Sequence, residues 1–501
     1  MGYLSTGVNI AQADGLIMLS DQPLTIFPPG VPLIAAAGHA SGLGAEAALR
    51  ITSIASFGAI VLLGARLLRR VTPHAAVRLG ATALLAVSPA LLGVSKMAWS
   101  EPPFIVVTIA FLMALARASD RRDLTWRDVA VLTSLCWIAF MLRYVGMALT
   151  AVAGLALLAS VRPLGLRALA RIAAFGLLSA SAPIAWMLRN HAADGTFLGH
   201  RSPSQDSVRD VAVRTAATLG EWLVPAPALS TRTLAVIGSA GAGVVLAGLA
   251  VAVWRPAGQS SEAGTGSPDP ASPTLTLTLC CALFCTVYIG YLSVASLSTS
   301  FEPTNSRYLS PAFLPAVAVA AVGATALLRL RPSAAAHRLL LAALVILLAS
   351  QTGASLRDAR DGAADGIGFN SLGWRRSALS EVASGIIESA DHPVVYSNSP
   401  SGLWAGTRIQ PVHWAPRDTG FRGVPTPREL DEFVEKVGCA TGDSYLVIHL
   451  FGDRRVVSLD RIRSVVDVER VGAAPDGAVF RVSAPAPARC PDELPARVRR
   501  T

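Results

Sequence analysis

The chain has 501 residues, of which 52% are hydrophobic and only 15% are charged, and its formal net charge is +10. Soluble domains carry roughly 25% charged residues, so this composition excludes an ordinary soluble enzyme and predicts a membrane protein. A positive charge also occurs in nucleic-acid-binding proteins, but here many arginines lie in short loops between apolar segments, where they orient a membrane protein. We therefore expect no nucleic-acid partner.

The first 47 residues precede the first long apolar segment and contain a proline-rich turn. Pro28, Pro29 and Pro32 lie within five residues, and their fixed backbone angles predict a rigid turn. One interpretation is the start of a re-entrant or interfacial helix. The other makes Tyr3, Pro28 and Pro29 part of a substrate site. Residues 1–30 are too polar for a signal peptide.

Ten apolar segments are predicted to cross the membrane, whose hydrocarbon layer is about 30 Å thick. The stretch 129–160 is interrupted by Leu142-Arg143-Tyr144, and we interpret it as two short spans. The remaining eight are 48–69, 75–95, 102–118, 170–188, 232–254, 275–297, 309–328 and 338–352.

Alternate loops between these spans are rich in arginine, and the positive-inside rule places those loops in the cytoplasm. The intervening loops and both ends of the chain then face the exoplasm. Because an exoplasmic start without a preceding span is unusual, we expect a further span upstream. The cytoplasmic arginines are Arg66, Arg69, Arg70, Arg78, Arg117, Arg121, Arg122, Arg127, Arg162, Arg167, Arg171, Arg255, Arg329, Arg331 and Arg338.

The predicted fold class is mainly α: a polytopic transmembrane helical bundle followed by a small exoplasmic α/β domain. We expect a transmembrane domain at 1–352, with a first exoplasmic loop at 1–47, and the α/β domain at 353–501. The segment 256–273 is a low-complexity cytoplasmic linker. In the tail we predict helices at 373–389 and 427–437, and strands at 393–397, 444–450, 464–471 and 478–482.

Charged side chains in the exoplasmic loops are the first candidates for chemistry. Glu101 lies in a very short loop between spans, where a carboxylate is costly unless it is paired, solvated or functional; a helix-capping role is the alternative. Arg143 and Tyr144 interrupt an apolar stretch. The Arg143 guanidinium either extends to the interface or binds a phosphate or carboxylate through its forked donors.

A second Arg-Tyr pair follows on the same predicted side. Asn305, Arg307 and Tyr308 directly precede the span at 309–328. Interfacial tyrosines are common, so Tyr308 alone indicates little, whereas two Arg-Tyr pairs together indicate a site for an anionic lipid headgroup. His200 and Arg201 in the long loop are weaker candidates, for which a solvated surface is the favoured interpretation.

The cysteines give no metal-ligand spacing, and no exoplasmic acidic cluster is visible, so no cofactor is expected and a divalent metal is not indicated. Cys439 and Cys490 lie in the polar tail. They could form a disulfide if the tail is outside the cytoplasm.

Several segments together resemble the GT-C superfamily of membrane glycosyltransferases, in particular the bacterial relatives of protein mannosyltransferases and of the lipid A aminoarabinose transferase. The segments are GYLSTGVNIAQADGL, FPPGVPLI, WSEPPF, LRYVGMAL and NSRYLSPAFLPA in the body, and GWRRSALSEV and VVYSNSPSGLWAGTRIQPV in the tail. Each is short, and their order and shared membrane side carry the resemblance.

The resemblance implies transfer of a sugar from a polyprenyl-phosphate carrier to an acceptor hydroxyl, with inversion. Glu101 would position the acceptor or the donor sugar, Arg143 and Arg307 would bind the lipid phosphate, and Tyr144 and Tyr308 would line the sugar site. Members of this superfamily usually carry an essential Asp shortly before a tyrosine like Tyr3, and this chain begins at that point. Asp14 is the nearest carboxylate and a poor substitute.

The expected partners are a polyprenyl-phosphate sugar, the cell membrane, and a cell-envelope glycan, lipid or protein as acceptor. A polytopic transporter or lipid flippase is the alternative function, but it would place ionisable residues in the middle of its spans and would give the tail of about 150 residues no role. A non-catalytic envelope scaffold is a third interpretation.

Overall fold

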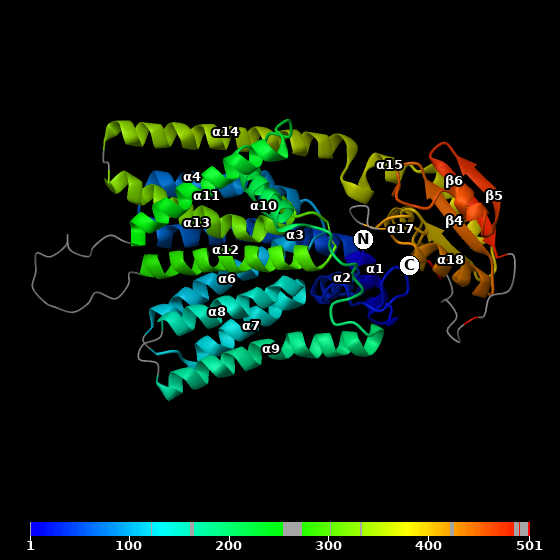
Figure 1. The fold of residues 1–501 in the computed structure, drawn as a ribbon, viewed down its shortest axis with the longest axis horizontal. Coiled ribbons are helices and arrows are strands. Elements are labelled where there is room, and N and C mark those ends of the chain that lie inside the picture. Colours follow the sequence, from blue (N-terminus) through cyan, green and yellow to red (C-terminus); the bar gives the residue numbers. More distant parts are fainter. Residues whose placement is uncertain are drawn as a thin grey trace, which may run out of the picture. The chain divides into compact units, whose positions relative to one another are not determined.

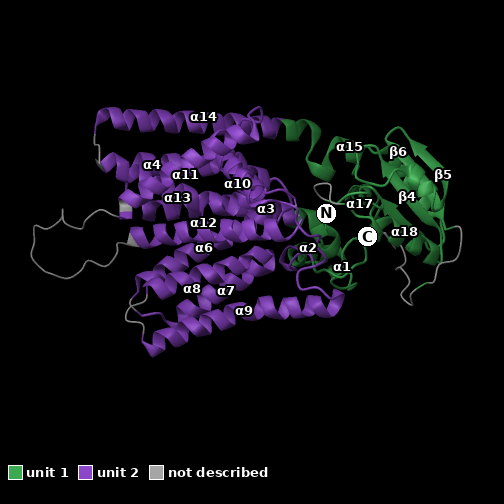
Figure 2. Ribbon diagram, viewed as in Figure 1, with its two compact units in different colours: residues 1–25, 32–48, 361–501 green, residues 26–31, 49–360 purple. Residues whose placement is uncertain are grey.

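A computed structural model describes residues 2–121, 123–160, 165–253, 273–300, 302–330, 333–420, 425–484, 490 and 499–500. Residues 256–272 of the linker predicted at 256–273 therefore lie outside the described residues, as do Arg122, Arg162, Arg255 and Arg331. The chain forms two compact units (Figure 2): residues 26–31 and 49–360, called here the membrane unit, and residues 1–25, 32–48 and 361–501, called the C-terminal unit.

Long helices make up the membrane unit and run side by side (Figure 1). The short 3₁₀ turn η1 (Tyr144–Gly146) separates two of them. The helices are α3 (Ala45–Val71), α4 (Ala75–Val87), α5 (Pro89–Ser95), α6 (Glu101–Asp120), α7 (Trp126–Leu142), α8 (Met147–Ser160), α9 (Leu166–Asp194), α10 (Val208–Leu223), α11 (Thr231–Val253), α12 (Pro273–Ser298), α13 (Ser306–Leu330) and α14 (Ala334–Asp365).

Eight helices in the described part of the chain are long and apolar enough to cross a membrane, and they coincide with eight of the predicted spans. The two short spans predicted in 129–160 are α7, with 17 residues, and the segment of η1 and α8. One predicted span consists of α4 and α5, which are separated at Ser88. The Ser88 side chain accepts a hydrogen bond from the Ala90 amide, and Pro89 begins the new helix.

Small residues let two of the helices approach closely. A Cβ atom added to Gly248 of α11 would lie 2.7 Å from the Cα of Gly323 in α13. Membrane helices gain little from burying apolar surface against each other, so close backbone packing of this kind contributes much of their association.

The C-terminal unit combines short helices with a sheet (Figure 1). Its helices are α1 (Gly2–Ala11), most of α2 (Gly30–Ala40), η3 (Gly368–Asn370), α15 (Leu372–Arg375), α16 (Ala378–Glu388), α17 (Pro400–Thr407), α18 (Arg428–Cys439) and α19 (Leu459–Arg463). Its strands are β1 (Val394–Ser397), β2 (Ile409–Gln410), β3 (Val412–Trp414), β4 (Ser444–His449), β5 (Asp467–Ala474), β6 (Gly477–Ser483) and β7 (Arg499–Arg500).

Five of these strands form one mixed sheet in the order β3-β1-β4-β6-β5. Strands β3, β1 and β4 are parallel, β6 pairs antiparallel with β4, and β5 pairs antiparallel with β6. From β1 the chain continues to β3 on one side, and it then returns past β1 to β4. The carboxyl ends of β1 and β4 are therefore a point where the connections diverge.

Helices cover both faces of the sheet, because buried apolar side chains point to both. Helix α18 places Leu430, Phe433 and Val437 on one stripe, and they pack with Tyr396 of β1 and Leu446 of β4. Helices α16 and α17 contact the strands from the other face. The predicted small α/β domain is confirmed.

The predicted elements of the tail are present, with one strand boundary shifted and one helix divided in two. The strand predicted at 464–471 is β5, which begins at Asp467 because Ser464 still ends helix α19. The helix predicted at 373–389 is divided into α15 and α16, since Ser377 caps a new helix start at the amide of Ser380. Cys439 and Cys490 form a disulfide.

Candidate functional site

Glu101 is the first residue of α6, and the sequence around it favours a helix start. Pro102 and Pro103 follow directly, and proline is tolerated in the first helical turn because the amides there have no acceptor within the helix. A carboxylate in this turn also interacts favourably with the helix dipole. The Glu101 side chain is 0% exposed, so its charge must be compensated within the protein.

Two arginines provide that compensation. Arg143 forms an ion pair with Oε1 of Glu101, and Arg307 Nε donates a hydrogen bond to the same oxygen at 2.7 Å. Arg143 Nη1 also donates to Ser100 Oγ at 3.1 Å. Side chains that are far apart in the sequence therefore meet at a single carboxylate oxygen.

Arg143 reaches Glu101 because it interrupts the helical path. It lies between α7 and η1 with φ of −154° and ψ of 137°, which is an extended conformation. Its side chain is 12% exposed. The break that the sequence predicted at Leu142-Arg143-Tyr144 thus turns a guanidinium into the protein interior.

Asn305 positions the second arginine by capping α13. Its Oδ1 accepts hydrogen bonds from the amides of Arg307 at 3.0 Å and Tyr308 at 3.3 Å. Its Nδ2 donates to Glu302 Oε1 at 3.1 Å, and Glu302 Oε2 in turn lies 3.3 Å from Arg307 Nη1. The loop before α13 therefore holds Arg307 between a buried carboxylate and a half-exposed one.

Aromatic rings surround the two guanidiniums. The Arg307 guanidinium carbon lies 4.0 Å from the centre of the Trp99 ring and 5.4 Å from that of Tyr308, and Arg143 lies 6.0 Å from the Tyr308 ring. These distances allow cation–π attraction. Tyr288 Oη donates to the Tyr308 carbonyl at 2.7 Å and anchors this turn to α12.

We call Glu101, Arg143, Glu302, Arg307 and Tyr308 the arginine cluster. It lies at one end of the helical bundle, where α6 and α13 begin and α7 ends. Within the described part of the chain, Arg307 Nη2 donates to no other residue. The cluster therefore presents a partly exposed guanidinium whose orientation is fixed, which suits an anionic oxygen ligand.

Tyr144 contacts a different set of residues from its neighbour Arg143. Its hydroxyl accepts hydrogen bonds from Trp186 Nε1 at 3.1 Å and from Asn190 Nδ2 at 3.0 Å, both on α9. Arg189 lies over the Trp186 ring at 5.0 Å. The two members of this Arg-Tyr pair thus connect α9 and α6 to the same break in the chain.

The proline turn supports that break. Pro28 and Pro29 are buried, and a Cβ atom on the next residue, Gly30, would overlap the carbonyl of Met141 near the end of α7. The turn therefore lies in backbone contact with the residues that lead into Arg143.

The long loop between α9 and α10 contacts the start of the same turn. Arg201 Nη2 donates to the Ile26 carbonyl at 3.0 Å, while Arg201 and His200 are both exposed. Arg201 thus has a structural contact that the sequence did not indicate, and His200 lies at the surface.

Tyr3 and Asp14 belong to the C-terminal unit. Tyr3 lies half-buried on α1, and Asp14 follows that helix, with its amide donating to the Asn9 carbonyl at 2.9 Å. The Asn9 side chain accepts a hydrogen bond from Gln410 Nε2 at 2.6 Å. This first segment therefore packs against the sheet domain of its own unit.

Sequence reasoning missed two contributors to the arginine cluster. One is Glu302, where Glu302-Pro303 repeats the Glu-Pro pattern of Glu101-Pro102 at a second helix-bounding loop. The other is Trp99, which begins the segment WSEPPF and lies under the Arg307 guanidinium. The repeated Glu-Pro pair is the signal that would have identified Glu302.

The residues that the structure describes contain no group of three or more His, Cys, Asp or Glu side chains that could hold a metal ion. The expectation that no cofactor is needed stays a prediction.

Solved structures resemble the whole chain. ArnT from Cupriavidus metallidurans, a lipid A aminoarabinose transferase, matches in its apo state with a TM-score of 0.57 and 13% identity, over 96% of this chain and 92% of that one. The same protein bound to undecaprenyl phosphate matches with a TM-score of 0.57 and 12% identity, over 98% and 94%. The chain therefore shares the fold of ArnT, a GT-C membrane glycosyltransferase and one of the proteins that the sequence resembles.

A mycobacterial arabinofuranosyltransferase, AftD, matches with a TM-score of 0.49 and 13% identity, over 97% of this chain and 39% of that one. No family model matches the sequence, and no curated protein matches it.

Proposed function

We propose that this protein is a membrane glycosyltransferase that moves a sugar from a polyprenyl-phosphate donor to an acceptor hydroxyl on the exoplasmic side. The observation that carries the proposal is the arginine cluster, located at one end of a bundle whose fold matches ArnT, a protein solved with undecaprenyl phosphate. A lipid phosphate would enter from the membrane and meet Arg307 and Arg143.

In the proposed reaction an oxygen–carbon bond forms between the acceptor hydroxyl and the anomeric carbon. The bond from that carbon to the phosphate oxygen breaks, and the polyprenyl phosphate leaves with its electron pair. The hydroxyl proton passes to a carboxylate base. The two guanidiniums stabilise the charge that develops on the leaving phosphate, which is where fixed cations contribute most to a rate.

Glu101 then acts mainly by positioning the arginines. Its Oε1 already accepts from both guanidiniums, which leaves that oxygen little capacity for an acceptor hydroxyl. The role in sugar positioning that the resemblance implies for Glu101 stays a prediction. Asp14 remains the sequence-based candidate for the base.

Glu302 is the partner of Arg307 that a phosphate could most easily replace. Its side chain is 44% exposed and its carboxylate lies 3.3 Å from Arg307 Nη1, whereas Glu101 is fully buried. An incoming phosphate can replace a half-exposed carboxylate at far lower cost than a buried one, because breaking a buried pair leaves an uncompensated charge. We infer that the donor phosphate displaces Glu302 and leaves Glu101 in place.

The disulfide supports the proposed side of the membrane. Cys439 and Cys490 are bonded, and disulfides persist in oxidising compartments outside the cytoplasm. A C-terminal unit on that side also agrees with the arginine-rich loops being cytoplasmic.

The test incubates membranes that contain the protein with a radiolabelled polyprenyl-phosphate sugar, and measures both label transfer and binding of the product polyprenyl phosphate. Arg307→Ala and Arg143→Ala should each weaken binding and lower transfer at least tenfold. Glu302→Gln should instead tighten phosphate binding, because it removes a competing negative charge.

Arg329→Ala is the matched control, because this arginine is exposed in the last turn of the same helix as Arg307, far from the cluster. It should leave both quantities unchanged. If both cluster variants transfer label at the wild-type rate, the proposed function is wrong. If Glu302→Gln weakens binding as strongly as Arg307→Ala, the exchange of partners is wrong.

A further inference from the structure

A second candidate site lies beyond the carboxyl end of strand β4, in the C-terminal unit. In open α/β sheets, ligands bind beyond the carboxyl ends of parallel strands where the connections diverge. Asn398 ties the two strand ends together: its Nδ2 donates to the His449 carbonyl at 2.8 Å, and its Oδ1 accepts from the His449 amide at 2.9 Å. The rim of the sheet is therefore well ordered at this point.

A hollow of about 440 Å³ opens beside the end of β4. Phe451, two residues beyond the strand, lines it together with Pro475, Asp476 and Arg376. The hollow combines a flat aromatic surface with one carboxylate and one guanidinium. Binding pockets for small molecules have this composition: a mostly apolar lining with a few polar groups that fix orientation.

The Phe451 ring is exposed but held in place. It is 43% exposed, and its centre lies 4.5 Å from that of Trp374 at an angle of 81°. Trp374 is itself fixed, because its ring contacts His449 at 4.9 Å and packs against the backbone of α17 at Gly402, where a Cβ atom would overlap the indole. An exposed aromatic ring with a fixed orientation is a surface for stacking.

Asp476 supplies an acceptor with unused capacity. Its Oδ1 accepts from the Leu379 amide at 2.9 Å near the start of α16, whereas its Oδ2 is buried and has no hydrogen-bond partner in the part of the chain described. A buried carboxylate oxygen without a partner is costly, and a ligand hydroxyl would satisfy it. Arg376 is exposed and supplies donors on the same hollow.

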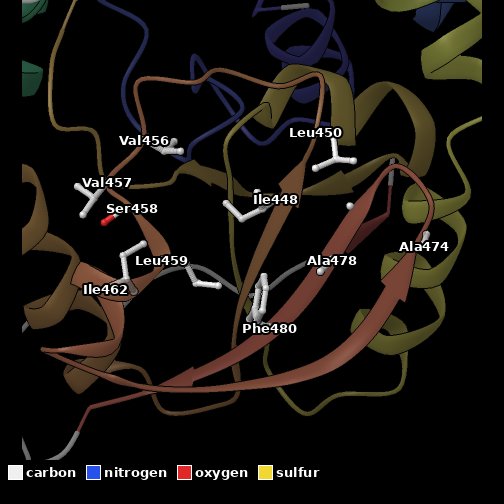
Figure 3. A pocket seen from close by; sticks show the side chains of 11 residues that line it. Ile448, Leu450, Val456, Val457, Ser458, Leu459, Ile462, Ala474, Ala478 and Phe480 are labelled. Atoms are coloured by element: carbon white, nitrogen blue, oxygen red, sulfur yellow. The ribbon is translucent and has the colours of Figure 1, made fainter.

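A second hollow, of about 410 Å³, serves as a comparison, because its lining is almost entirely apolar. It lies against β4, β5 and β6 and is lined by apolar side chains such as Ile448, Leu450 and Phe480, with Ser458 as its polar side chain (Figure 3). The Ser458 hydroxyl already caps α19 by accepting a hydrogen bond from the Arg461 amide, and the described lining of that hollow has no charged side chain to orient a polar ligand. Leu450 and Phe451, although consecutive, line different hollows.

We propose that the hollow at Phe451 binds a neutral sugar unit of a glycan. A sugar ring has an apolar C–H face that stacks on an aromatic ring, and hydroxyls that both donate to Asp476 and accept from Arg376. A phosphate could bond to Arg376 but would be repelled by the Asp476 carboxylate, whereas a neutral sugar can bond to both. The site stands on the geometry of the C-terminal unit alone and is independent of sugar transfer.

The experiment measures binding of neutral hexasaccharides of glucose, mannose, galactose and arabinose to the full chain by saturation-transfer NMR. The protein is held in lipid nanodiscs free of glycoside detergent, since a detergent sugar would compete. At least one hexasaccharide should bind saturably, and Phe451→Ala, Arg376→Ala and Asp476→Asn should each weaken that binding at least tenfold. Asp476→Asn retains an oxygen for the Leu379 amide and so separates binding from folding.

Leu450→Ala is the matched control, because it changes the neighbouring residue and the other hollow; it should bind as the wild type does. The proposal is overturned if no hexasaccharide binds, if the three variants bind normally, or if Leu450→Ala loses binding equally. Saturable binding of inorganic phosphate in place of the sugars would also overturn it.

Discussion

Glu101→Gln is the most direct test of how the arginine cluster works. The substitution keeps the size of the side chain and one acceptor oxygen, but it removes the only fully buried charge in the cluster. Arg143 and Arg307 both bond to Oε1 of this carboxylate, so both lose a charged partner at once. We expect the two guanidiniums to lose their fixed orientation.

The magnitude follows from the two bonds. A hydrogen bond to a charged group contributes about 1.5–3 kcal/mol and a neutral one about 0.5–1.5 kcal/mol, so exchanging two of them costs about 2–3 kcal/mol. Since about 1.4 kcal/mol corresponds to a factor of ten in rate, kcat/KM for sugar transfer should fall about 30- to 150-fold. Glu302→Gln, at a half-exposed position, should cost far less in turnover.

The assay compares kcat/KM for transfer from a labelled polyprenyl-phosphate sugar in nanodiscs that contain equal amounts of folded protein. Glu388→Gln, an exposed carboxylate in the C-terminal unit, serves as the control. The opposite outcome is tighter phosphate binding, because Glu101→Gln also removes a negative charge beside two arginines. If Glu101→Gln bound polyprenyl phosphate more tightly and transferred sugar at the wild-type rate, the positioning role of Glu101 would be refuted.

Three further predictions concern stability. Tyr144→Phe removes the acceptor of two N–H groups on α9, and should lower the free energy of unfolding of the membrane unit by about 1–3 kcal/mol, seen as a lower melting temperature in nanodiscs. Burial lowers the pKa of His413 and of His449 to about 4, below the 6.5 of an unfolded chain. The unfolded state therefore binds more protons, and hydrogen-exchange protection of β3 and β4, corrected for intrinsic rates, should fall between pH 6.5 and pH 4; unchanged protection would contradict this sign. Cys490→Ser opens a covalent link across 51 residues, which should cost about 4 kcal/mol and increase exchange in α18, whereas an equally protected α18 would show that the disulfide adds little.

The sequence predicted most of the helices, because hydrocarbon thickness sets a length that is visible in a single chain. It also predicted the break at Arg143, since a charged residue is costly in the middle of a span. It missed β3 and α17, with three and eight residues, because such short elements show too little periodicity. The contact of Asn9 with Gln410 joins distant parts of the chain, which composition does not reveal.

For the site, the sequence predicted the residue types and their shared end of the bundle. It did not predict that Arg143 and Arg307 would converge on one oxygen of Glu101, because this depends on how α6, α7 and α13 pack. Glu302 was missed for the same reason: only the cap at Asn305 turns its carboxylate toward Arg307. The local sequence identifies charged residues that could belong to a site, whereas the packing of the helices determines which of them form ion pairs.

The contact between Gly30 and the carbonyl of Met141 has a consequence for engineering. The proline turn lies far upstream in the sequence of the helix end that it supports. The conformation at Arg143 therefore depends on two segments that are distant in the sequence. A chimera that transfers only helices α6 to α8 into a related protein would contain Arg143 but would lack the turn at 26–31 that supports its backbone. Successful grafts will have to transfer the turn at 26–31 as well, and even a methyl group added at Gly30 should be enough to disturb the recipient.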